Sequence, residues 1–151
     1  MDIVGLLTRP EGRISRAPYW IGWSIILGVE IALRLGLDIP FAPTPADAVS
    51  VRALSFLIDV FLLYPSITVM VKRLHDRDRS GWLTGWLIVP SAVLMLTNLL
   101  GMSGDPDHMG VVETLLLIAT SVIALAFIIE LGFRPGTRGD NQYGPDTLEH
   151  A

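Results

Sequence analysis

The residues best suited to chemistry are an adjacent histidine and aspartate, His75 and Asp76, inside the charged run KRLHDRDRSGW. Such a pair can exchange protons with a substrate or contribute ligands to a metal ion. The sequence lacks the usual zinc-protease, phosphate-loop and serine-elbow motifs, and it contains no cysteine. A structural role also suits the pair, with Asp76 held by a neighbouring arginine and His75 bound to a loop carbonyl. We therefore expect no catalytic residue, metal or cofactor, and keep a lipid-phosphate enzyme using His75 and Asp76 as the second alternative.

Four basic residues lie close to the ends of the first two apolar stretches. Arg13 and Arg16 precede the first stretch, and Lys72 and Arg73 follow the second. We expect them to form a basic collar at the cytoplasmic leaflet, where anionic lipids attract each such residue by about 1 kcal/mol. Guanidinium forks suit phosphate, so one interpretation is a specific pocket for a phosphate-bearing lipid or a small anion. The other is that these charges only set the topology and hold headgroups.

The last polar stretch, GFRPGTRGDNQYGPD, is rich in residues that form tight turns. Gly139, Asn141, Gly144 and Pro145 all favour turn conformations. This density predicts a folded cap over one end of the protein rather than a loose tail. We expect Tyr143 to sit beneath the basic collar.

A second group of charges falls inside the apolar stretches. Glu30 and Arg34 are four residues apart in the first stretch, so they share a helix face and can pair. Asp59 in the second stretch lies at a similar predicted depth, which makes an intramembrane charge cluster of these three residues plausible. An ionisable group in hydrocarbon is a functional hypothesis by default, although the cluster can also simply lock two helices together. Glu130 and Arg134 have the same spacing and are expected to form an anchoring pair.

The elements that must position these residues are four long apolar stretches. The chain is 51% hydrophobic and only 17% charged, which leaves too few polar residues to cover a soluble domain. Stretches at about 19–37, 51–71, 82–101 and 111–133 reach the roughly 20 residues that a helix needs to cross a bilayer. The sequence predicts an all-α membrane protein, a four-transmembrane-helix bundle forming a single domain over residues 1–151. Segments 1–18, 72–81 and 134–151 are expected outside the hydrocarbon, as an ordered loop and a C-terminal cap.

Basic residues are strongly biased to one side of these spans. Nine of them precede the first span, separate the second from the third or follow the fourth, whereas Arg52 alone lies on the other side. The positive-inside rule therefore predicts that both termini and the middle segment are cytoplasmic. All four tryptophans fall near the same side, as expected for an interfacial belt: Trp20, Trp23, Trp82 and Trp86.

Three motifs occur in a fixed order along the chain. GRISRAPYW precedes the first span, KRLHD with SGW lies between the second and third, and GDNQYGPD follows the fourth. Together with the number and spacing of the spans, they resemble the bacterial inner-membrane family known as domain of unknown function 805. The resemblance covers nearly the whole chain. It implies a multi-pass protein of the bacterial inner (cytoplasmic) membrane and brings no assigned activity or catalytic residue.

We expect a non-enzymatic membrane protein whose basic cytoplasmic face binds anionic lipid headgroups or a protein partner. Nucleic acid is not expected as a partner, because the basic residues lie beside the membrane. Gly81 and Gly85 have the spacing of helix contacts, which leaves a homo-oligomer open. The first alternative is a small proton-coupled transporter using Glu30 and Asp59. The candidate residues of the binding face are Arg13, Arg16, Trp20, Lys72, Arg73, His75, Asp76, Trp82, Asn141 and Tyr143.

Overall fold

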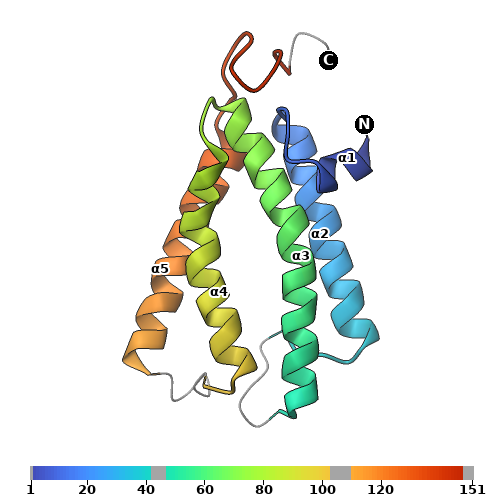
Figure 1. The fold of residues 1–151 in the computed structure, drawn as a ribbon, viewed down its shortest axis with the longest axis vertical. Coiled ribbons are helices and arrows are strands. Elements are labelled where there is room, and N and C mark those ends of the chain that lie inside the picture. Colours follow the sequence, from blue (N-terminus) through green and yellow to red (C-terminus); the bar gives the residue numbers. More distant parts are fainter. Residues whose placement is uncertain (1, 42–46, 103–109, 148–151) are drawn as a thin grey trace.

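The computed structural model describes residues 2–41, 47–102 and 110–147 of the chain. In these residues the protein is all-helical, with one short helix and four long helical segments (Figure 1). The elements are α1 (Ile3–Thr8), α2 (Arg16–Gly36), α3 (Val49–Asp76), η1 (Gly81–Thr84) running into α4 (Gly85–Leu99), and α5 (Val111–Phe127) running into the π-helical turn η2 (Ile128–Phe133). The predicted all-helical fold with four membrane-length helices is confirmed.

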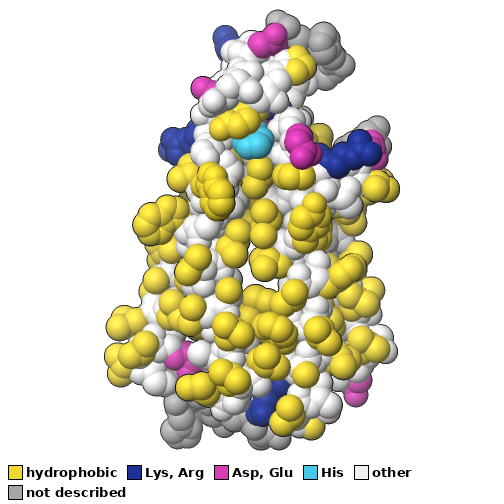
Figure 2. Space-filling view, in the orientation of Figure 1, with side chains coloured by type: hydrophobic (Ala, Val, Ile, Leu, Met, Phe, Trp, Pro, Cys, Tyr) yellow, Lys and Arg dark blue, Asp and Glu magenta, His cyan; other side chains and the backbone are white. Residues whose placement is uncertain are grey.

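The four long segments carry most of their apolar side chains on the outside. Each is long and apolar enough to cross a membrane. None of the most apolar part of the last segment, Val111–Phe133, is buried inside the protein, and very little of the third is. Apolar side chains consequently cover the face seen in Figure 2. A helix that is apolar all round needs an apolar solvent where protein does not cover it, so this surface fits lipid.

Helix α3 is the centre of the bundle and contacts α1, α2, α4 and η2. Its buried residues Val69, Met70 and Leu74 form the core together with Tyr19 of α2 and Leu131 of η2. Close packing with α2 depends on a missing side chain, because a Cβ at Gly22 would lie 2.9 Å from a methyl carbon of Val69. Gly81 and Gly85, which have the spacing of helix contacts, differ in their surroundings. Gly81 packs on Val71 of the same chain, whereas nothing lies within 4 Å of the Cβ position at Gly85.

Helix α3 continues five residues past the predicted end of the second span, from Val71 to Asp76. Residues 72–76 were expected in a loop, but they form the last turn of α3. The turn stays helical because its residues face protein rather than water: Lys72, Arg73, Leu74 and Asp76 are all buried. His75 and Asp76, the pair best suited to chemistry, therefore lie at the rigid end of a helix.

The two ends of the bundle differ in composition. One end gathers the segments before α2, between α3 and η1, and after η2; we call residues 2–15, 77–80 and 134–147, together with the adjoining ends of the helices, the polar end. Helix α1 and the segment after η2 lie together there in Figure 1. The three distinctive motifs therefore meet at one end of the bundle, as predicted. Residues 148–151 of the expected cap lie outside the described residues.

Candidate functional site

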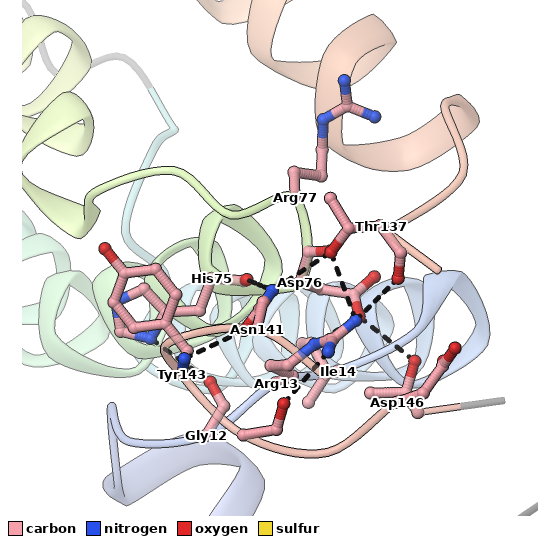
Figure 3. A network of polar contacts seen from close by, with 12 residues as sticks. Gly12, Arg13, Ile14, His75, Asp76, Arg77, Thr137, Asn141, Tyr143 and Asp146 are labelled. Atoms are coloured by element: carbon pink, nitrogen blue, oxygen red, sulfur yellow. Dashed lines mark hydrogen bonds and ion pairs between the residues drawn. The ribbon is translucent and has the colours of Figure 1, made fainter. Parts of the chain in front are cut away.

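An aspartate at the end of α3 binds two arginines in the interior of the polar end (Figure 3). Asp76 accepts hydrogen bonds from Arg13 Nε at 3.2 Å, from Arg73 Nη1, and from Thr147 Oγ1 at 3.1 Å. The side chains of both arginines are 1% exposed and that of Asp76 is 2% exposed. We call Arg13, Arg73 and Asp76 the clasp. Its single carboxylate binds two cations, so the remaining guanidinium donors need other acceptors.

Arg73 donates its other hydrogen bonds to backbone carbonyls where α5 and η2 end. Its Nε donates to Leu131 O at 2.7 Å, and Nη2 donates to Arg134 O. Nη1 also reaches Ile14 O, before α2, at 3.2 Å. The last carbonyls of a helix have no partner within the helix, and a cation there is favoured by the helix dipole. Arg73 of α3 thus caps the C-terminal end of η2.

Arg13 likewise donates hydrogen bonds to backbone carbonyls, here those of the polar segment after η2. Its Nη1 donates to Gly139 O at 2.8 Å and to Gly144 O at 3.1 Å, and its Nη2 donates to Thr137 O at 2.8 Å. The Thr137 N–H in turn donates to the backbone carbonyl of Asp76 at 2.8 Å. The segment closes too tightly for a side chain at Gly136, where a Cβ would lie 2.0 Å from an Asp76 carboxylate oxygen. The expected folded cap is present in residues 134–147.

His75 is fixed on three sides. Its Nδ1 lies 3.2 Å from Gly12 O, and because a carbonyl only accepts, Nδ1 carries the proton. Its ring stacks on that of Tyr143, with centroids 3.8 Å apart and planes 4° from parallel. Its backbone carbonyl accepts from Asn141 Nδ2 at 2.9 Å. With Asp76 enclosed by the clasp, this geometry gives the lipid-phosphate enzyme no support. No group of three His, Asp or Glu side chains able to hold a metal occurs in residues 2–41, 47–102 and 110–147.

The other candidates at this end divide into one buried residue and three exposed ones. Lys72 is 8% exposed, and its ammonium donates to Gly5 O of α1. Arg16 is exposed and donates to Phe133 O at 3.3 Å. Trp20 donates its indole N–H to Gly132 O at 3.1 Å while 40% of the residue stays exposed. Trp82 is 91% exposed, at the start of η1. The structure thus places part of the expected collar inside the protein and part on its surface.

Glu130 of η2 lies among three arginines. The expected pair with Arg134 is confirmed at 2.9 Å. Arg77 also binds Glu130, at 2.8 Å, and Arg79 lies 3.6 Å away. Arg77 further donates to Pro135 O at 2.7 Å. This network ties the turn after α3 to the end of η2.

The intramembrane charge cluster forms as expected. Arg34 is 3% exposed and donates to Glu30 Oε1 at 3.0 Å and to Asp59 Oδ1. The same guanidinium donates to Ser55 Oγ at 2.9 Å and to Pro40 O at 3.2 Å. Helices α2 and α3 are therefore joined by one buried cation between two carboxylates. The cluster is distant in the fold from the clasp, toward the other end of both helices.

Four residues that complete the polar end were not predicted as site residues: Gly136, Thr137, Arg77 and Thr147. Their roles depend on the path of the backbone after η2, which brings carbonyls 131–139 past α3. A signal for one of them is visible in the sequence, because Gly136 follows a proline in a short stretch crowded with turn-forming residues. The threonines and Arg77 have no pattern of their own.

The comparisons with known proteins agree with this layout. A family model described as "Protein of unknown function (DUF805)" matches residues 7–145. The chain is 34% identical over 142 residues to "Uncharacterized protein YiiR" of Escherichia coli strain K12, covering 92% of this chain and 86% of that protein. The protein of that name in Escherichia coli O157:H7 matches equally. No solved structure matches. Since the family model matches most of the chain and the relative is similar over 92% of it, the chain belongs to the family Protein of unknown function (DUF805).

Proposed function

We propose that this protein is a non-enzymatic, multi-pass component of the bacterial inner membrane whose polar end faces the cytoplasm and binds anionic lipid headgroups. The supporting observation is that an exposed arginine and an exposed aromatic residue lie within four positions of each other in the sequence at three helix ends. Arg16 with Trp20 begins α2, Arg79 with Trp82 precedes and begins η1, and Phe133 with Arg134 ends η2. All six residues are exposed.

Each of these pairs matches the chemistry of the membrane interface. An indole or phenyl ring sits favourably between hydrocarbon and headgroups, and a guanidinium beside it can bind a lipid phosphate through two N–H groups. Arg13 and Arg73 are excluded from this role because their side chains are only 1% exposed and their donors bind the protein's own oxygens in the interior. The proposed lipid contacts are therefore Arg16, Arg79 and Arg134.

The orientation can be tested directly because the chain has no cysteine. Two exposed positions mark opposite ends of the bundle, Glu11 and Ala48. In intact spheroplasts, a membrane-impermeant maleimide should label Ala48→Cys at once and Glu11→Cys only after the membrane is permeabilised. The reverse pattern would refute the cytoplasmic assignment of the polar end.

Lipid binding is tested with the protein in nanodiscs that contain phosphatidylcholine and a minor fraction of phosphatidylglycerol. Native mass spectrometry should show retained phosphatidylglycerol on the wild type. Each of Arg16→Gln, Arg79→Gln and Arg134→Gln should weaken retention by about fivefold, the equivalent of about 1 kcal/mol per juxtamembrane arginine. Arg138→Gln is the matched control, since Arg138 is exposed but farther from the helix ends. Equal retention by all four variants would contradict the proposal.

A further inference from the structure

Two cavities lie side by side between the pair α2–α3 and the pair α4–α5. One has a volume of about 270 Å³ and the other about 340 Å³. They share five lining residues, Trp23, Ile26, Glu30, Met70 and Leu87. Figure 2 shows the molecule hollowed in this region, among apolar side chains. The larger cavity alone falls within the size range of pockets that hold small organic molecules.

The smaller cavity has an unbalanced charge on its wall. Glu30 and Asp59 both line it, and their side chains are 29% and 30% exposed. Arg34, which pairs with both, does not line it and is 3% exposed. Two carboxylates and one guanidinium leave one negative charge when all three are ionised. One oxygen of each carboxylate binds Arg34, and each of these cavity-lining side chains has a second oxygen with which it can attract a ligand cation.

The two hydroxyl groups of this cavity are poor donors for a ligand, which leaves the indole N–H of Trp23, without a hydrogen-bond acceptor in the described residues, as its one neutral side-chain donor. The hydroxyl of Ser66 already donates to Leu62 O at 2.8 Å, and that of Ser91 donates to Leu87 O at 2.8 Å. The rest of the wall is mainly apolar, including Leu63 and Met95. A site with acidic acceptors, occupied hydroxyl donors and apolar walls disfavours anions and sugars. It favours a positive charge carried on an apolar body.

We propose that this cavity binds a lipophilic organic cation, whose charge lies against Glu30 and Asp59 and whose apolar groups fill the space between the helix pairs. In hydrocarbon the extra negative charge is costly until a cation balances it. An apolar body also gains from leaving water for the cavity. This site is separate from the headgroup contacts at the polar end, so either proposal can fail without the other.

The test uses tritiated benzyltributylammonium, a permanent cation with an apolar body, and full-length protein in nanodiscs of uncharged lipid. Equilibrium dialysis, with binding to empty nanodiscs subtracted, should show saturable binding to the wild type. Excess unlabelled cation should compete, whereas N,N-dibutylbenzamide, of similar size and uncharged, should not. Asp59→Asn and Glu30→Gln should each weaken binding at least tenfold, and Asp78→Asn at the polar end should leave it unchanged.

A second kind of variant tests the cavity without altering its charges. Ser91→Leu fills part of the space while Glu30, Arg34 and Asp59 stay in place, so it should also weaken binding at least tenfold. Thermal unfolding identifies the variants that retain the fold, and only those are compared. Absence of saturable binding to folded wild type would overturn the proposal. So would wild-type affinity in folded Ser91→Leu, or equal competition by the uncharged amide, because both indicate partitioning rather than a site.

Discussion

The sharpest prediction concerns the carboxylate of the clasp. Asp76→Asn keeps the shape of the side chain but removes the only carboxylate paired with Arg13 and Arg73 in the described residues. Both guanidinium groups are enclosed, with side chains 1% exposed. Breaking a buried ion pair from one side costs about 3–5 kcal/mol, because the remaining charge stays buried without compensation. At about 2–4 °C per kcal/mol for a chain of this size, the midpoint of thermal unfolding should fall by about 6–20 °C.

The matched control lies two residues further along. Asp78 is exposed, and its carboxylate accepts from Gln142 Nε2 at 3.1 Å. Its φ of 54° belongs to the left-handed region, which asparagine tolerates well. Asp78→Asn should therefore change stability by no more than about 0.5 kcal/mol. Thermal unfolding and limited proteolysis of residues 134–147, both in detergent, report the difference. Indistinguishable midpoints and cleavage rates for the two variants would refute the assignment of the clasp as the main support of the polar end.

Three further predictions use the same unfolding assay. Gly136→Ala places a Cβ 2.0 Å from a carboxylate oxygen of Asp76 and should lower the free energy of unfolding by about 1–3 kcal/mol. Gly28→Ala is the control, because nothing lies within 4 Å of its Cβ position, and it should not destabilise the protein. Equal effects of the two variants would contradict the close contact at Gly136. Tyr143→Ala should lose the ring stacking on His75, which is worth about 0.5–1.5 kcal/mol, whereas Tyr143→Phe should retain most of this stability. A large loss of stability in Tyr143→Phe would show that the hydroxyl group, and not the stacking, stabilises this contact. Arg34→Met leaves the carboxylates of Glu30 and Asp59 without their cation and should lower the free energy of unfolding by about 3–5 kcal/mol. Replacing both carboxylates by amides in that variant should recover part of the lost stability. No recovery would argue against a charge effect.

The sequence was most informative where a single local rule decides the structure. Four apolar stretches of membrane length predicted the four long helical segments, because helix length follows from bilayer thickness. The four-residue spacing of Glu30 and Arg34 predicted their ion pair, since such residues share a helix face. The same rule predicted the pair of Glu130 with Arg134. Asp59 joined the cluster because antiparallel neighbours of similar depth meet.

The polar end was predictable only in outline. Its aspartate–arginine contacts and the histidine–carbonyl contact follow from residue types, and they are present. The burial of Arg13 and Arg73 does not follow, because it depends on the carbonyls that the backbone after η2 brings beside them. Another such carbonyl, Leu131 O, lies in the π-helical turn Ile128–Phe133, which no local residue pattern predicted. Tertiary contacts therefore decided which arginines face outward.

The clasp joins residues that are synthesised at different times. Synthesis proceeds from the N-terminus, so Arg13 and Asp76 are already in place when residues 137–147 emerge. Until that segment arrives, Arg13 lacks the carbonyl acceptors of Thr137, Gly139 and Gly144. A chain that stalls or is clipped before Thr137 consequently keeps the ion pairs with Asp76 but leaves the Nη1 and Nη2 donors of Arg13 without these acceptors. Residues 137–147 therefore supply acceptors that Arg13 needs although they follow it by 124 or more positions in the chain.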